Sequence, residues 1–271
     1  MSPRWRDEVA IFVGPRQLAL VRRARGLRRR VVATAELAIP AGAAGDLDAV
    51  CGRLAATLAD PAWQGGAARV VVADHPWARY AVVPWPATRL DAAGRLAQAR
   101  FALGDAHGEA VADWAVTLAD TPPGQATVAC AMPAALRGAL EDTLAPARLV
   151  LVSLQPQLVA AFEAWRRLLP ADDAWFASVD EGALSALHLS RGAWDQVHLA
   201  RLGPDWSVEL ERLQALGRLS RPAGAPGRLF VDAPGWMRRA ATGSAGVEWL
   251  EGEGRDVGQG HALTLLQRAC A

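Results

Sequence analysis

The feature that most constrains the fold of this chain is a pattern that occurs twice. Three short apolar runs joined by tight turns are followed by alternating strand-like and helix-like segments. The first copy begins with EVAIFVG at residue 8, and the second begins with WFASVDEG at residue 175. Short runs rich in β-branched and aromatic residues and bounded by glycine or proline are typical of hairpin strands. We therefore expect two related halves, each built on a three-stranded antiparallel meander.

The segments after the first meander predict alternating helices and buried strands. In DLDAVCGRLAATL, Asp46 is a suitable helix N-cap, and the apolar residues fall on one helical stripe. RVVVA, which follows, is a continuous apolar run of the kind found in strands buried on both faces. PAALRGALEDTL places Leu136, Leu140 and Leu144 at i, i+4 and i+8. Because right-handed crossovers lay such helices on a sheet, we predict an α/β fold.

The segment from residue 75 to residue 125 interrupts this rhythm. It is rich in proline and tryptophan at first, and it ends in two strand-like runs joined by a Pro-Pro-Gly turn, which predicts a hairpin. We interpret it as an inserted subdomain. The expected organisation is a first half, residues 1–170, containing this insertion, and a shorter second half, residues 171–271.

Composition excludes several classes of protein. Hydrophobic residues make up 52% of the chain and charged residues 21%, so the chain can bury a sizeable core and is not of the disordered type. The formal net charge of +1 gives no bulk attraction to nucleic acid or membranes. The three cysteines have no paired spacing, which argues against a disulfide framework or a zinc site and fits a reducing compartment. No run approaches the ~20 apolar residues that a membrane helix needs.

Three stretches carry a resemblance to a known family. VDEGALSALHLSRG is similar to an Asp-x-Gly-Ala hairpin. LVLVSLQPQLVAAFEAW is similar to a strand, a proline and a helix that together close a first half. ARYAVVPWP is similar to the entrance of an extra subdomain. With the order of elements, these resemble the PilM/GspL family of pilus and secretion assembly proteins. The resemblance implies a duplicated actin-like (RNase H-like) ATPase fold. It also implies a cytoplasmic scaffold, peripheral to the inner membrane through a partner.

The partners that this resemblance implies are proteins. The first is the short cytoplasmic tail of an inner-membrane assembly protein, and the others are an assembly ATPase and a second copy of the chain. Nucleic acid is not expected as a partner. Two alternatives stay open at this point: an active actin-like ATPase or small-molecule kinase, and a nucleic-acid-binding RNase H-like protein. The latter needs carboxylates on adjacent central strands, and the first strand has none within its apolar run, residues 9–13.

Actin-like folds hold nucleotide phosphates with glycine-bearing hairpin turns and carboxylates that bind Mg²⁺. The residues that match these loops are Gly14, Asp180, Gly182 and Ser185. Phe12 stands where the first loop should have aspartate, and Pro15 removes a backbone donor. The third turn has Asp232, Pro234, Gly235 and Trp236 in place of a glycine pair. We therefore predict vestigial loops, no catalytic residues and no bound ATP or Mg²⁺.

The insertion supplies the predicted partner site. WARYAVVPWP offers a strand-like edge along which an extended tail could pair. Arg79 would hold a carboxylate or carbonyl group, and Tyr80 and Trp85 would supply apolar contact. The alternative is that these residues pack the insertion onto the rest of the protein.

Two further groups of residues have weaker interpretations. The arginine cluster from Arg22 to Arg30 is either a solvated hairpin tip or, through Arg28, Arg29 and Arg30, a contact for anionic headgroups or an acidic partner. If one hairpin turns at Gly192, His188 and His198 point to opposite faces, and no metal site is expected.

Overall fold

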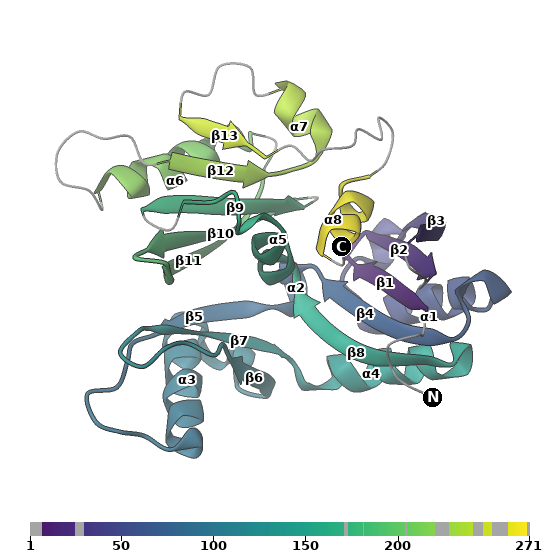
Figure 1. The fold of residues 1–271 in the computed structure, drawn as a ribbon, viewed down its shortest axis with the longest axis horizontal. Coiled ribbons are helices and arrows are strands. Elements are labelled where there is room, and N and C mark those ends of the chain that lie inside the picture. Colours follow the sequence, from purple (N-terminus) through teal and green to yellow (C-terminus); the bar gives the residue numbers. More distant parts are fainter. Residues whose placement is uncertain are drawn as a thin grey trace. The chain divides into compact units, whose positions relative to one another are not determined.

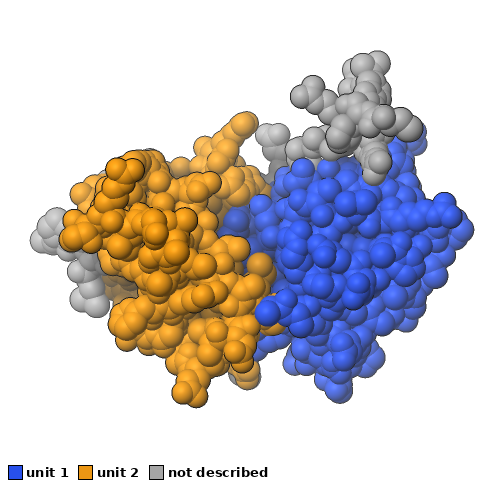
Figure 2. All heavy atoms as spheres, turned by 90° about the horizontal axis from the view of Figure 1, so that it is seen from below, with its two compact units in different colours: residues 1–77, 134–160, 256–271 blue, residues 78–133, 161–255 orange. Residues whose placement is uncertain are grey.

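The computed structural model describes residues 7–24, 30–170, 173–180, 182–203, 205–219, 228–240, 246–250 and 260–269. Packing divides the chain into two compact units (Figure 2). Unit 1 comprises residues 1–77, 134–160 and 256–271, and unit 2 comprises residues 78–133 and 161–255. These units follow packing, whereas the expected halves follow chain order, so the boundary at residue 170 stays a prediction.

Unit 1 is built on a five-stranded mixed sheet with the strand order β3-β2-β1-β4-β8 (Figure 1). Its strands are β1 (Glu8–Val13), β2 (Gln17–Ala24), β3 (Arg30–Ala38), β4 (Gly66–Val72) and β8 (Leu149–Pro156). The first three form the predicted antiparallel meander, and β4 and β8 continue the sheet in parallel with β1. The sequence pattern is therefore confirmed in the first half.

The helices of unit 1 are α1 (Leu47–Leu58), the short α2 (Asp74–Trp77), α4 (Ala134–Leu144) and α8 (His261–Ala269). Of these, α1 and α4 confirm the sequence prediction. The Asp46 carboxylate accepts a hydrogen bond from the backbone N–H of Asp48 at 3.0 Å, which confirms the N-cap. The apolar stripes of α1 and α4 are buried, and these two helices pack against each other.

Helix α8 comes from the C-terminal end of the chain but packs on β1 and β2 of the N-terminal meander (Figure 1). Arg23, which is buried, donates hydrogen bonds to the carbonyl oxygens of Leu266, at 3.3 Å, and of Gln267. These carbonyl groups lie in the last turn of α8, where the helix dipole favours a cation. The sequence gives no indication of this contact, because 243 residues separate Arg23 from Leu266.

Unit 2 contains a second five-stranded sheet with the order β11-β10-β9-β12-β13. Its strands are β9 (Ala174–Asp180), β10 (Ala183–Ser190), β11 (Ala193–Arg201), β12 (Arg228–Asp232) and β13 (Val247–Trp249). A meander of three antiparallel strands is again followed by two strands parallel to the first. Both sheets thus have one topology, which confirms that the repeated sequence pattern is a structural duplication.

Helices cover the second sheet on both faces. They are α5 (Gln157–Trp165), α6 (Ser207–Leu219) and α7 (Gly235–Ala240). Trp175 and Val179 share one core cluster with Leu213 of α6 and Met237 of α7. On the opposite face, the rings of Phe162 of α5 and Phe176 of β9 meet edge to face at 6.1 Å.

The insertion forms a small layer of sheet and helix within unit 2, and this layer extends beyond the expected end at residue 125 to residue 133. Its elements are β5 (Arg79–Val83), α3 (Ala92–His107), β6 (Trp114–Leu118) and β7 (Thr127–Pro133), with the strand order β5-β7-β6. The pairing of β6 with β7 confirms the predicted Pro-Pro-Gly hairpin. Val83, Leu103 and Ala129 lie in its core. None of the described helices of the chain is long and apolar enough to span a membrane.

Candidate functional site

The first candidate phosphate loop, the β1–β2 turn, is filled by a side chain. The N–H of Gly14 donates to the carbonyl oxygen of Gln17 at 2.8 Å, so the turn itself consists of Pro15 and Arg16. Phe12 is 1% exposed. A Cβ atom placed on Gly14 would lie 2.8 Å from Cε1 of Phe12. Gly14 therefore makes room for the Phe12 ring, which occupies part of the loop's inner surface.

The second candidate loop, the β9–β10 turn, keeps a polar inner surface. Asp180 ends β9 and pairs with Ala183, and Gly182 in the turn has a φ of 84°, which favours glycine. Glu181 lies outside the described residues. The Asp180 side chain belongs to a buried polar group that also includes Ser178, Ser185 and Asp232.

Strand pairing places three of these residues in one row across the sheet. Ser178 of β9 pairs with Ser185 of β10 on one side and with Asp232 of β12 on the other. Paired residues point to the same face, and Asp180 is two positions beyond Ser178 on that face. We call these four residues the polar row. Asp180 and Asp232 thus lie on the adjacent parallel strands β9 and β12.

Strand pairing in the two hairpins shows which residues of the first loop correspond to which residues of the second. The motifs align Phe12 with Asp180, but each hairpin has a two-residue turn, Pro15–Arg16 in the first and residues 181–182 in the second. Counted from these turns, Gly14 corresponds to Asp180, and Phe12 corresponds to Ser178. The predicted equivalence of Phe12 and Asp180 is therefore wrong by two residues, because strand pairing and not motif spacing sets the register.

The corresponding row in the first sheet is entirely apolar. Phe12 pairs with Ala19 of β2 and with Val71 of β4, and all three residues are buried. The polar row of the second sheet thus has an apolar counterpart. The second hairpin offers the Asp180 carboxylate and two hydroxyl groups, and β12 adds the Asp232 carboxylate, whereas the paired residues Phe12, Ala19 and Val71 of the first sheet offer none.

The third candidate loop follows β12 and leads directly into helix α7. Asp232 is buried at the end of the strand, and Trp236, in the first turn of α7, is 54% exposed. Its counterpart after β4 holds Asp74, which the sequence analysis did not select. The buried Asp74 carboxylate accepts a hydrogen bond at 3.0 Å from the N–H of Leu158, in the first turn of α5. Asp74 therefore acts as a structural cap.

The predicted partner residues of the insertion are only partly available. Tyr80 is 4% exposed, and its carbonyl oxygen lies 2.8 Å from Nε2 of His107, so its ring cannot supply a surface contact as predicted. Ala81 and Val83 of β5 point into the subdomain core, so Tyr80, which alternates with them, is buried on the opposite face of the strand. The Arg79 guanidinium donates to the carbonyl oxygen of Ala78 and lies 5.6 Å from the centre of the Trp114 ring.

Trp85 is the predicted partner residue that lies at the surface. Its side chain is 41% exposed, and the guanidinium of Arg95 lies 5.8 Å from the centre of its ring. The depression beside it has a volume of about 10 Å³ and includes Arg95 and Gln98 of α3 in its lining. A partner segment would therefore lie over this surface rather than enter a deep pocket.

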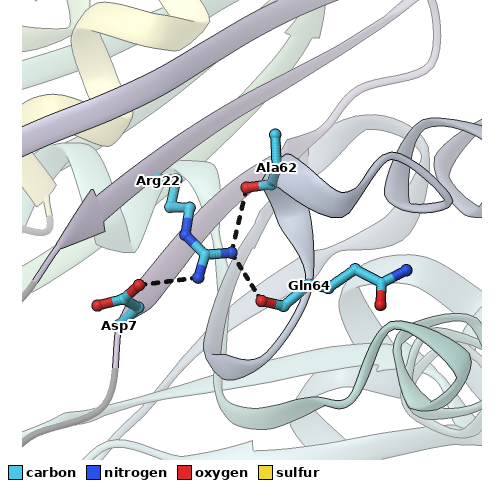
Figure 3. Close-up of polar contacts among 4 residues, drawn as sticks. All are labelled: Asp7, Arg22, Ala62 and Gln64. Carbon is cyan, nitrogen blue, oxygen red and sulfur yellow. Dashed lines mark hydrogen bonds and ion pairs between the residues drawn. The ribbon is translucent and has the colours of Figure 1, made fainter.

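The arginine cluster is not a uniform solvated tip. Arg22 donates to the Asp7 carboxylate at 2.8 Å and to the carbonyl oxygens of Ala62, at 3.1 Å, and Gln64, at 2.9 Å (Figure 3). With Arg23 bound to α8, two arginines of the cluster hold unit 1 together. Arg30 is exposed at the start of β3, whereas Arg28 and Arg29 lie outside the described residues. The headgroup interpretation thus concerns Arg30 and its neighbours alone.

The expected arrangement of the two hairpin histidines is also corrected. His188 pairs with Gln196, and His198 pairs with Ala186, because the β10–β11 register shifts between His188 and Leu189. Both histidines consequently point to the same face. His188 lies between two aspartates, and His198 lies 3.5 Å from Glu209. Among the described residues, no group of three or more His, Cys, Asp or Glu side chains could hold a metal ion.

The duplicated sheets with their paired hairpins define an actin-like fold. Solved structures agree. The chain superposes on the PilM–PilN type IV pilus biogenesis complex with a TM-score of 0.64 at 15% identity, covering 90% of this chain and 88% of that one. It superposes on the cytoplasmic domain of EpsL, an inner-membrane component of the type II secretion system of Vibrio cholerae, with a TM-score of 0.57 at 12% identity, covering 97% and 94%.

A third structure shares the fold without a stated function. It is a Bacteroides thetaiotaomicron protein with an actin-like ATPase fold, matched with a TM-score of 0.61 at 9% identity over 91% of each chain. No family model and no curated protein matches the sequence. The predicted PilM/GspL-like actin-like fold is therefore confirmed as a fold.

Proposed function

We propose that this chain is a non-catalytic scaffold of a type IV pilus or type II secretion assembly platform. In this role it binds the cytoplasmic tail of an inner-membrane partner and lies at the inner face of that membrane. The similarity to structures of PilM–PilN and of the EpsL cytoplasmic domain supports the platform. The observation that supports the absence of catalysis is the Phe12 ring against Gly14, in a loop that should receive phosphate.

Calorimetry with Mg-ATP tests the absence of catalysis. Phosphate binding in this fold uses two hairpins, and here the first has Gly14 at the position of the Asp180 carboxylate, a proline without an N–H in its turn, and a buried phenylalanine beside it. We expect no heat of binding at micromolar ATP and no phosphate release. Micromolar binding with turnover that Asp180→Asn abolishes would overturn the proposal.

An active ATPase or small-molecule kinase is a second candidate, which the polar row favours. Asp180 and Asp232 are buried at the ends of adjacent strands, where carboxylates could hold Mg²⁺. This candidate requires the second hairpin to bind phosphate without the first. The same titration distinguishes the two functions, because only the second candidate predicts that Asp180→Asn and Asp232→Asn reduce a measurable affinity.

The surface around Trp85 is the proposed contact for the partner tail. An exposed tryptophan beside an arginine is the usual composition of an interface anchor. The probe is the cytoplasmic tail peptide of the inner-membrane protein encoded beside this chain. Trp85→Ala should weaken its binding by about 2 kcal/mol, roughly thirtyfold. Phe101→Ala, at another exposed aromatic side chain of the insertion, is the matched control. If both variants bound the peptide as tightly as the unaltered chain, Trp85 would not be part of the contact with the tail.

A further inference from the structure

A buried histidine of unit 2 lies between two carboxylates. His188, in β10, is 4% exposed. Its Nε2 atom lies 3.3 Å from Oδ1 of Asp173, and its Nδ1 atom lies 3.4 Å from Oδ2 of Asp195. Both ring nitrogens therefore face an oxygen that, in an ionised carboxyl group, only accepts hydrogen bonds. We call these three residues the histidine clamp.

Two irregularities of the backbone place the carboxylates at the ring. The register of β10 with β11 shifts between His188 and Leu189, and Asp195 is the extra residue of this β-bulge. Bulges re-aim side chains in this way. Asp173, which precedes β9, has a φ of 53°, a left-handed conformation that is uncommon for residues other than glycine. Such outliers persist where the surrounding structure holds them, and they are frequent at switch regions.

Groups from the neighbouring strands and from helix α6 surround the clamp. On β9, the ring of Trp175, which pairs with His188, has its centre 5.2 Å from the centre of the imidazole ring. On β11, the paired residue is the neutral Gln196. Other ionisable residues near this part of the hairpin are Arg191 of the β10–β11 turn, His198 of β11, and Glu209 and Arg212 of α6. Of the charged groups named, Asp173 and Asp195 are those that contact the ring.

The protons on the ring decide how many of its contacts are favourable. A neutral imidazole has one N–H donor and one acceptor nitrogen, whereas the charged ring has two donors. When His188 is neutral, its acceptor nitrogen faces an ionised carboxylate, and this contact is repulsive. When the ring is charged, both contacts join opposite charges, which makes hydrogen bonds stronger. Imidazole groups in general change charge between about pH 5 and 8.

We propose that the histidine clamp is a pH-dependent switch, closed when both ring nitrogens of His188 carry a proton and opened on one side when one proton is lost. The closed clamp ties the residue before β9 to the bulge of β11, across β10. Its contribution to stability is present at low pH and is lost as the pH rises, because the folded chain holds both carboxylates at the ring and thereby favours its charged form. This inference goes beyond the proposed function and does not depend on it.

The bulge also connects the clamp to helix α5. Trp194 is the residue before Asp195, and its ring meets Phe162 of α5 edge to face at 5.3 Å. Among the described strands, β11 lies at the edge of the second sheet (Figure 1). A bulge that loses its contact with His188 can shift, and Trp194 shifts with it. We therefore expect the hairpin of β10 and β11 to loosen when the clamp opens.

Hydrogen–deuterium exchange of the full chain, measured by mass spectrometry of its peptides, tests the switch. The intrinsic exchange rate at each pH divided by the measured rate gives a protection factor, which removes the effect of pH on the exchange chemistry itself. Protection of β10 and β11 should fall about tenfold between pH 5.5 and pH 8.0, which is the order expected for the loss of one hydrogen bond between charged groups. Protection of β1 and β2 in unit 1 is the internal reference and should stay constant.

Three variants separate the proton from the packing. His188→Gln has no group that changes charge in this range, so protection of the hairpin should be equal at both pH values. Asp195→Asn offers the neutral ring an N–H donor, so its protection at pH 8.0 should equal or exceed that of the unaltered chain. His198→Gln is the matched control. It removes the other histidine of the hairpin, which lies 3.5 Å from a single carboxylate, and should keep the tenfold change.

Two results would overturn the proposal. The first is a protection of β10 and β11 that changes with pH no more than that of β1 and β2. The second is a His188→Gln variant that keeps the full change. If circular dichroism shows that this variant does not fold, Asp195→Asn decides, because the Asp195 side chain is 53% exposed and tolerates the exchange of one oxygen for nitrogen. Loss of the pH dependence in Asp195→Asn supports the switch, and its retention overturns it.

Discussion

Replacing Phe12 by alanine should greatly destabilise unit 1, because Phe12 is a core residue beside the β1–β2 turn. The side chain is 1% exposed and pairs across the sheet with Ala19 and Val71. Truncation removes the ring and leaves a cavity beside Gly14, and such changes cost about 3–5 kcal/mol. Burial of about 150–200 Å² of ring surface gives a similar value, about 4–5 kcal/mol.

Urea denaturation followed by tryptophan fluorescence measures this cost. Trp63 and Trp77 are buried in unit 1 and report on its unfolding. A loss of 3–5 kcal/mol is a large fraction of the 5–15 kcal/mol that stabilises a typical domain, so the midpoint should fall clearly. Phe101→Ala is the control, because Phe101 is 77% exposed and its truncation should change the free energy of unfolding by less than about 0.5 kcal/mol.

Phe12→Asp sharpens the test. It introduces a carboxylate at the position that corresponds to Ser178 and buries it between Ala19 and Val71. A buried charge without a partner is strongly unfavourable, so this variant should be less stable than Phe12→Ala and should not gain affinity for ATP. If Phe12→Ala cost less than about 1 kcal/mol, or if Phe12→Asp were stable and bound Mg-ATP, the interpretation of this loop as core would be refuted.

Three further predictions concern other residues of unit 1. Arg22→Ala should lower the free energy of unfolding, measured by urea titration, by about 1.5–3 kcal/mol, because it removes hydrogen bonds that join β2 to residues 62–64. Arg166→Ala, which removes an exposed ion pair, is the control and should change this free energy little. Burial raises the pKa of the Cys51 thiol, with Asp48 adding to the effect and a hydrogen bond with Thr143 opposing it. At pH 8 Cys51 should therefore react more slowly with a thiol reagent than a free cysteine does, and a reaction as fast as that of free cysteine would contradict this. The contribution of the buried, protonated thiol to the free energy of unfolding should be lost as the pH rises through the raised pKa. Arg30→Ala, together with alanine at Arg28 and Arg29, should leave stability nearly unchanged but reduce salt-sensitive pelleting with anionic vesicles, and pelleting that does not depend on salt would exclude a headgroup contact.

The local sequence determined much of the secondary structure and, through its repetition, the topology. Asp46 caps α1, and Leu136, Leu140 and Leu144 are buried on α4, as their spacing predicts. These features depend on residues a few positions apart, where helix and strand periodicity are visible in the sequence. The duplication could be predicted for the same reason, since each meander shows its own runs and turns.

Only the tertiary structure determined which residues of distant segments meet. The polar row depends on pairing between β9 and β12, and the shared face of His188 and His198 depends on a register shift that no turn signal reveals. Tyr80 is buried on the face of β5 opposite to the core residues Ala81 and Val83, although its neighbours in the sequence suggested a surface. Arg22 reaches Gln64 across 42 residues of chain. The physical reason is common to all of these cases: packing and pairing free energies depend on neighbours in space, whereas sequence patterns report on neighbours along the chain.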